Sequence, residues 1–287
     1  MIWEERPDGL RAPAMVCAFG GWNDAAEAAT AAVSFLASSL DAYRFAHIDP
    51  EEFYDFQATR PQISLIEGEA REISWPMVEI WAAKAPRAPR DLILLTGPEP
   101  SMRWNTLCES VVDLAEAMNV QMAVSLGALL ADVPHTRPVP MVGVTSDEEL
   151  AERVGLSPTT YEGPTGITGV LHSAFQESGI PSASLWASVP HYVAAAPNPK
   201  ASLALVRKLE SLVGVSFDAT ELERAASDYE RRVSSAVAGD DDVRQFVERL
   251  EQASDAEAPE SEGEEVPSGD VLAREFQRFL NQRGDDA

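Results

Sequence analysis

AMVCAFG, residues 14–20, decides the fold of this chain. The run is short, apolar and closed by glycine, which is typical of a strand buried on both faces. The next segment, NDAAEAATAAVSFLASSL (residues 23–40), has the composition of a helix. A buried strand followed by a helix is the repeating unit of an α/β fold with a parallel sheet.

This unit recurs as far as about residue 215. Further buried strands are predicted at DLILLTG (91–97), QMAVSLGAL (121–129), MVGVTS (141–146) and SASLWASV (182–189). Further helices are predicted at 103–119, 147–155, 166–179 and 198–214. Residues 44–85 differ, because they carry strand-like runs in series, and EGEAR (67–71) has the composition of a hairpin turn. We therefore predict an α/β fold with a mostly parallel or mixed sheet flanked by helices, antiparallel in part.

The composition divides the chain into four parts. We predict an α/β core domain (1–216), a charged helical extension (217–253), an acidic flexible linker (254–268) and an amphipathic C-terminal helix (269–284). One face of the last helix gathers Val271, Leu272, Phe276, Phe279 and Leu280. A tethered amphipathic helix is expected to dock on its own body or on a neighbouring subunit.

The charge and the cysteine content restrict the partners and the compartment. A formal net charge of -25 over 287 residues repels nucleic acid and anionic lipid, so neither is expected as a partner. Cys17 and Cys108 have no CxxC spacing and are expected to be buried thiols of a reducing compartment. Neither a signal-peptide pattern nor a long apolar run is present, so we expect a cytoplasmic protein.

Polar residues follow the first two predicted strands, at the edge where α/β sheets bind ligands. Asn23 and Asp24 lie after the first strand, either at the rim of a pocket or, as we favour, where they start a helix. Glu99 and Arg103 follow DLILLTG. The Arg103 guanidinium is suited either to a ligand carboxylate or phosphate or to an ion pair with Glu99, and both interpretations remain open.

The tripeptide Val-Pro-His occurs twice, each time at the end of a predicted strand. His135 and Arg137 lie in the proline-stiffened VPHTRPVP, and His191 begins the turn after SASLWASV. A histidine there is suited to proton transfer, although Asp132 could orient His135 only if the loop folds back. A plain crossover between strands explains the prolines equally well.

YEGPTGITG (161–169) precedes a predicted helix and brings Tyr161, Glu162 and Thr165 to the same edge. Free N–H groups at the start of that helix favour an anion, while a simple turn with close helix packing is the alternative. The segment matches neither GxxxxGK[ST] nor GxGxxG, so neither phosphate-binding motif is available.

The chain contains no complete catalytic or metal-binding set. His135 and His191 have no further ligand at HxH, HxxxH or cysteine spacing, and no GxSxG is present. We therefore expect no metal, no cofactor and no assigned catalytic residue.

Five ordered motifs together resemble the proteasome assembly chaperone 2 family, in its actinobacterial branch. They are FGGWNDAAEAAT, GPEPSMRW, LGALLADVPHTRPVP, YEGPTGITGVL and PHYVAAAPNPKA, and the resemblance covers about residues 14–201. It implies an α/β sandwich similar in architecture to nucleoside phosphorylases, and a homo-oligomer. It also implies binding to proteasome subunits, as eukaryotic and archaeal relatives bind α-subunits during assembly. The last residues, NQRGDDA, lack the hydrophobic-Tyr-X ending of proteasome-docking relatives, so that mode of docking does not carry over.

Two functions follow. The favoured one is a non-enzymatic oligomeric interaction or assembly factor, with proteasome subunits or another protein as partner. The alternative is an enzyme or small-molecule binder. Its pocket at the strand ends would be formed by Asn23, Asp24, Glu99, Arg103, His135, Arg137, Tyr161, Glu162, Thr165 and His191.

Overall fold

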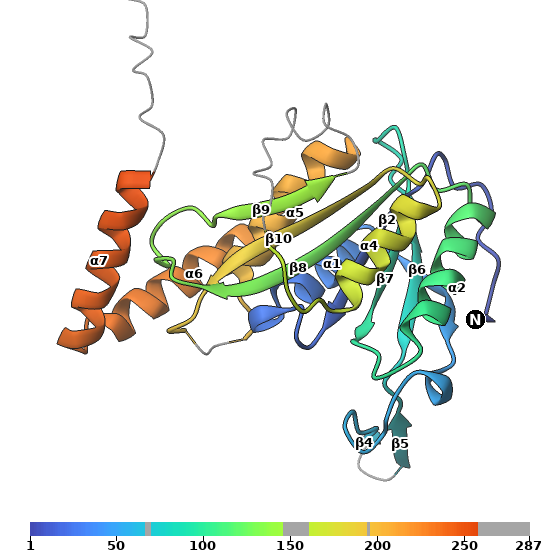
Figure 1. Cartoon of the computed structure of the whole chain (residues 1–287), viewed down its shortest axis with the longest axis horizontal. Coiled ribbons are helices and arrows are strands. Elements are labelled where there is room, and N and C mark those ends of the chain that lie inside the picture. Colours follow the sequence, from blue (N-terminus) through green and yellow to red (C-terminus); the bar gives the residue numbers. More distant parts are fainter. Residues whose placement is uncertain (67–69, 146–160, 194–195, 258–287) are drawn as a thin grey trace, which may run out of the picture.

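Eight strands form one mixed sheet in the order β1-β3-β6-β7-β2-β8-β10-β9 (Figure 1). The computed structural model describes residues 1–66, 70–145, 161–193 and 196–257. In sheet order the strands are β1 (Ile2–Trp3), β3 (Tyr43–Ile48), β6 (Val78–Ala83), β7 (Leu92–Pro98), β2 (Ala14–Gly20), β8 (Met122–Ala131), β10 (Ser182–Pro190) and β9 (Met141–Thr145). The predicted α/β fold with a mixed sheet is confirmed.

The centre of the sheet is parallel, and its flanks are antiparallel. The four strands β7, β2, β8 and β10 run parallel, whereas β6, β3 and β1 on one side and β9 on the other pair in antiparallel fashion. The central strands are apolar along nearly their whole length because helices cover both of their faces. The predicted antiparallel section within 44–85 is also confirmed.

Helices cover the sheet in two layers (Figure 1). On one face α1 (Ala28–Ser39) and α5 (Pro199–Val213) pack against alternate residues of β2, such as Val16. On the other face α2 (Trp104–Ala117) and α4 (Ile167–Glu177) pack against the intervening residues, such as Cys17. The strands β2 and β7 are neighbours in the sheet, but the helices that follow them lie on opposite faces. The helix α1 follows β2 on one face, and α2 follows β7 on the other. This arrangement makes the β2–β7 border a topological switch point, where α/β sheets bind ligands.

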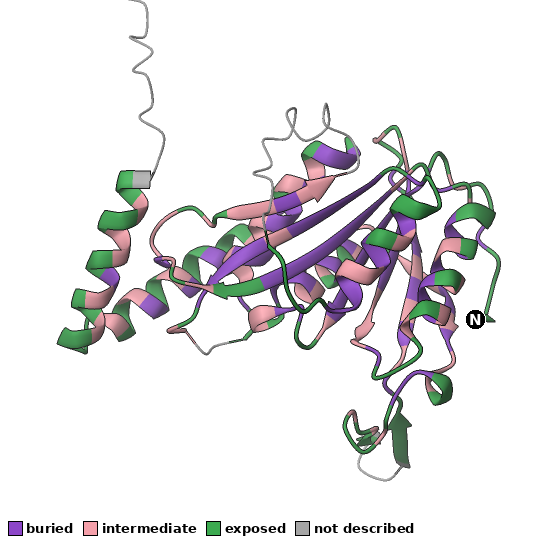
Figure 2. Ribbon diagram, in the orientation of Figure 1, coloured by how far each residue is buried: buried purple, intermediate pink, exposed green. Residues whose placement is uncertain are grey.

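A separate two-stranded hairpin projects from the body, with β4 (Gln62–Ile66) and β5 (Ala70–Ser74) antiparallel (Figure 2). Ile63 is paired with Ile73, and strand alternation puts Leu65 on the same face. All three side chains are more than half exposed. An isolated two-stranded hairpin is marginally stable in water, so an exposed apolar face on such an arm favours contact with another protein surface.

The helical extension consists of α6 (Thr220–Val237) and α7 (Asp241–Glu257), separated by a short turn at residues 238–240. Residues 254–257 are helical, so the predicted start of the linker at 254 was wrong. The helix continues past 254 because Ala256 is a good helix former and because Arg137 forms an ion pair with Asp255. The predicted helices 147–155 and 269–284 and the rest of the linker lie outside the described residues.

The first helix begins later than the sequence indicated. A short 3₁₀ turn, η1 (Ala25–Glu27), precedes α1, and Ala26 and Glu27 adopt left-handed backbone angles. A similar turn, η2 (Pro50–Glu52), follows β3. Asp24 still initiates α1, because its carboxylate accepts hydrogen bonds from the Ala29 N–H (2.6 Å) and the Thr30 N–H (3.2 Å).

Candidate functional site at the carboxyl ends of the strands

The parallel strands end at one edge of the sheet and bring most of the predicted polar residues there in two groups. The first group, here the switch-point cluster, comprises Asn23, Glu99 and the start of α4 at Gly166 and Ile167. The second, here the Val-Pro-His cluster, lies at the ends of β8 and β10, where Pro190 is in register with Ala131.

The switch-point cluster is held together by the Glu99 carboxylate. Its Oε1 accepts from Asn23 Nδ2 at 2.5 Å and from the Ile167 N–H at 2.9 Å. Glu99 therefore occupies the N-terminus of α4, where free N–H groups and the helix dipole favour a negative charge. At the start of this helix, where the sequence favoured either an anion or a simple turn, a side chain of the protein itself accepts the hydrogen bond.

Gly166 permits this close approach. A Cβ atom at position 166 would lie 2.2 Å from Asn23 Oδ1 and 2.6 Å from Glu99 Oε1. Asn23 is fully buried, and its backbone carbonyl accepts from the Ala128 N–H at 2.8 Å. The crevice between β2 and β7 is thus closed by packed protein atoms.

The remaining residues predicted near this cluster have local roles. Thr165 Oγ1 lies 2.1 Å from where a Cβ of Gly169 would be, so it packs on the first turn of α4. Tyr161 Oη donates to the Pro164 carbonyl at 2.9 Å, and the Glu162 side chain is exposed. Arg103 does not pair with Glu99. It pairs instead with Glu52 at the end of η2, and its own backbone is left-handed at the start of α2.

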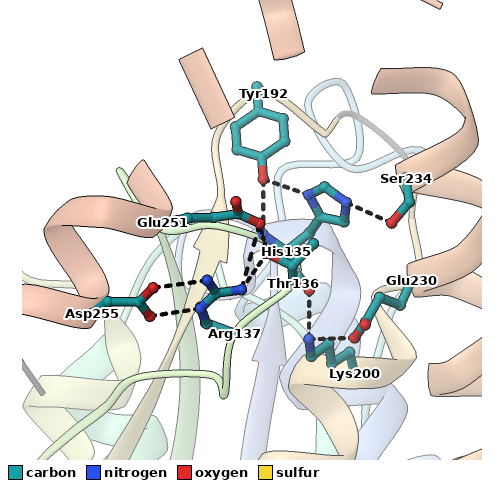
Figure 3. Close-up of polar contacts among 9 residues, drawn as sticks. All are labelled: His135, Thr136, Arg137, Tyr192, Lys200, Glu230, Ser234, Glu251 and Asp255. Atoms are coloured by element: carbon teal, nitrogen blue, oxygen red, sulfur yellow. Dashed lines mark hydrogen bonds and ion pairs between the residues drawn. The ribbon is translucent and has the colours of Figure 1, made fainter. Parts of the chain in front are cut away.

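His135 is the centre of the Val-Pro-His cluster and is only 3% exposed (Figure 3). Tyr192 Oη accepts from the His135 backbone N–H at 2.8 Å and lies 2.8 Å from the Nδ1 atom. In the neutral imidazole one ring nitrogen carries the proton and the other accepts, so Nδ1 shares a hydrogen bond with the Tyr192 hydroxyl and Nε2 shares one with Ser234 Oγ on α6, at 3.0 Å. Every polar atom of this neutral imidazole has a partner, so none remains for a substrate.

The rest of the turn is bound by ion pairs to the C-terminal helices (Figure 3). Arg137 makes a bidentate contact with Asp255 on α7, at 2.7 and 2.8 Å, and Thr136 donates to Glu251 on the same helix. Lys200 bridges the His135 carbonyl and Glu230 of α6, each at 2.5 Å. The core contributes the cations and the helices contribute the anions, so α6 and α7 are matched to this edge by charge.

His191 lies on the outer side of the same cluster and is not a second buried imidazole. Its side chain is 43% exposed and pairs with Asp132 at 2.9 Å, so Asp132 orients His191 rather than His135. The Tyr192 ring makes edge contacts with both imidazoles, with centroids 5.9 Å apart in each case. Phe246 of α7 packs on His191 and on Tyr192 at 5.6 and 5.9 Å.

Little space remains among these residues. The cavity bordered by Pro134, His135, Arg137 and Lys200 has a volume of about 10 Å³. That volume holds at most one water molecule and no substrate. Five partners at this site escaped prediction because they belong to helices whose charged surface is typical of a solvated face: Glu230, Ser234, Phe246, Glu251 and Asp255.

Two histidines predict a pH-dependent stability. Burial lowers the pKa of His135, with a further contribution from Lys200, and burial lowers the pKa of His172, whose ring nitrogens have no hydrogen-bond partner among the described residues. The unfolded chain therefore binds more protons, so stability is full above about pH 6.5 and is lost as the pH falls through the folded pKa values. We expect the urea midpoint to fall between pH 7.5 and 5.5.

The same titration on His172→Phe should show a smaller fall, because one of the two groups has been removed. A midpoint that rises on acidification in both proteins would contradict the neutral state assigned to these imidazoles.

The described residues contain neither a metal-binding cluster nor a helix suited to crossing a membrane. No cluster of three or more His, Cys, Asp or Glu side chains has the geometry to hold a metal ion. In the same part of the chain, no helix has both the length and the apolar content that crossing a membrane requires.

A family profile and the solved structures similar to this chain indicate the same family. The PAC2 family profile matches residues 18–237. A PAC2 family protein from Streptomyces avermitilis is 46% identical, with 82% of this chain and 99% of that chain aligned and a TM-score of 0.76. A proteasome-assembly chaperone homologue from Mycobacterium tuberculosis is 44% identical, again with 82% of this chain and 99% of that chain aligned and a TM-score of 0.76.

More distant structures share the fold. An archaeal proteasome activator from Pyrococcus furiosus is 18% identical and has a TM-score of 0.64, over 82% of this chain and 97% of its own. A search of the curated proteins found no match. The matched profile spans most of the sequence and the two bacterial structures align over nearly their full length, so this chain belongs to the PAC2 family.

Proposed function

We propose that this protein is a proteasome-assembly-chaperone-like interaction factor that acts without catalysis and as a homo-oligomer. One observation carries the proposal: the protein's own side chains fill the sheet edge at which this architecture places ligand pockets. Glu99 fills the switch point, and α6 and α7 cover the turn at His135. The similarity to a proteasome-assembly chaperone homologue indicates the class of partner.

The projecting hairpin supports the oligomeric part of the proposal. Its exposed face of Ile63, Leu65 and Ile73 has an apolar character that a monomer seldom leaves in water. The alternative function, a small-molecule enzyme, requires a cleft among the residues predicted for it, and the cavity at His135 and Arg137 has a volume of only about 10 Å³.

Size-exclusion chromatography with light scattering tests both parts. The full chain alone is expected to elute at a multiple of its 31.1 kDa mass. Mixed with separately purified, unassembled α-subunits of an actinobacterial proteasome, it should elute in a heavier complex that contains both proteins. The mixture is repeated at about 0.5 M salt, because a chain of charge -25 attracts basic proteins non-specifically and salt screens that attraction.

Elution of the chain at its monomer mass would contradict the oligomer. α-Subunits that elute unchanged at both salt concentrations would contradict the chaperone-like role.

A further inference from the structure

A groove of about 1180 Å³ lies beside the Val-Pro-His cluster, between the segment that follows β10 and the helices α6 and α7. Small apolar side chains make up much of its lining: Val193, Pro197, Ala225, Val233, Ala236 and Val243. None of the ten residues predicted from the sequence for a pocket belongs to this lining. The groove adjoins the Val-Pro-His cluster through Tyr192, which belongs to both.

The groove is open and apolar while its rim is charged. Pro197, Ala225 and Ala236 are exposed, although each would gain from burial. On the rim Asp228 pairs with Arg231 at 2.5 Å, whereas Arg232 takes part in no ion pair within the described ranges. Asp240 also borders the groove. A matching occupant would carry a narrow apolar face flanked by charges of both signs.

We propose that residues 271–280 of the same chain, here the tail segment, dock in this groove. These residues, VLAREFQRFL, lie outside the described part of the chain, and their sequence has the required character. At helical spacing one face carries Val271, Leu272, Phe276, Phe279 and Leu280. Glu275 is available to Arg232, and Arg274 and Arg278 are available to the carboxylates of the rim.

The connecting residues are long enough. α7 ends at Glu257, and its groove-lining residue Val243 lies 14 residues earlier, about 21 Å along the helix. Residues 258–270 can extend over about 43 Å, twice that distance. A connection of this length gives the tail segment a millimolar local concentration at the groove, which favours its own chain over a second copy.

Cysteine cross-linking in the full chain tests the docking. Cys17 and Cys108 are buried, and burial raises the pKa of both thiols, so neither competes for the reagent. The test variant carries Ala236→Cys in the groove and Asn281→Cys next to the tail segment. The control carries Ser227→Cys, exposed on α6 but outside the groove lining, with the same Asn281→Cys. A short bismaleimide links thiols that come close.

We expect the groove variant to form an intrachain cross-link about tenfold faster than the control, from the difference in local concentration. Adding Phe276→Asp and Phe279→Asp should remove the preference. Equal rates for the two variants would overturn the proposal, and a covalent dimer in place of the internal link would assign the tail segment to a second copy instead. Because the chain is tested alone, the result is independent of binding to proteasome subunits.

Discussion

Alanine in place of Gly166 is expected to lower the free energy of unfolding by about 2–4 kcal/mol. The added methyl group would lie 2.2 Å from Asn23 Oδ1 and 2.6 Å from Glu99 Oε1. Gly166 has φ of -99°, which alanine adopts without strain, so the whole cost comes from the collision. The Asn23–Glu99–Ile167 hydrogen bonds must break to accommodate the methyl group. Urea unfolding of the purified variant measures the effect.

Gly20→Ala is the matched control, since it adds the same methyl group at the end of β2. That methyl would meet Thr30 Cγ2 at 3.8 Å, an ordinary contact, and the expected change is within about 0.5 kcal/mol. If the two variants unfolded at the same urea concentration, the switch point would not be closed by packed atoms as described.

His135→Ala is expected to cost about 2–4 kcal/mol of unfolding free energy. The change opens a cavity at a side chain that is only 3% exposed, and it removes the hydrogen bonds of the ring with the Tyr192 hydroxyl and Ser234 Oγ. The contact between the turn and α6 weakens at the same time, so the C-terminal helices should become more sensitive to protease. Thermal unfolding and limited proteolysis measure the two effects.

His191→Ala is the matched control, because His191 is the histidine of the second Val-Pro-His tripeptide. Its imidazole is 43% exposed and pairs with an Asp132 carboxylate that is 80% exposed, so the expected loss is within about 1 kcal/mol. Losses of similar size for the two histidines would contradict the distinct roles assigned to the two copies of Val-Pro-His.

The sequence predicted the fold well because its signals are local. A run such as AMVCAFG can be buried on both faces only in the centre of a sheet, and AMVCAFG and DLILLTG both end in glycine. The parallel register then places the turns after β8 and β10 at one edge, which is why His135 and His191 were correctly expected on the same side. The late start of α1 escaped prediction, because the left-handed turn at Ala26 and Glu27 has no glycine to mark it.

The partners of the polar residues were beyond prediction from sequence. Arg137 binds Asp255, 118 residues later, and no spacing rule links two such positions. Arg103 had Glu99 close in sequence, yet it binds Glu52, while Glu99 binds Asn23 and the start of α4. Titratable residues at strand ends indicate a pocket when nothing is known of their partners. In this protein their partners are other side chains of the same chain.

The sheet edge has a structural role. In an enzyme of this architecture the strand ends would present unpaired polar groups to a ligand. Here the turn after β8 anchors α6 and α7, and so positions the groove beside Tyr229.

Hydrogen exchange at the turn of residues 133–137 tests the closed edge most directly. The His135 N–H donates to Tyr192 Oη beneath α6 and α7, so its exchange should require those helices to open. We expect the amide to exchange at least about 1000-fold more slowly than in an unstructured peptide, with the same protection as the core of α6. Exchange at the rate of an exposed loop would mean that the edge is open to ligands, and it would contradict this account.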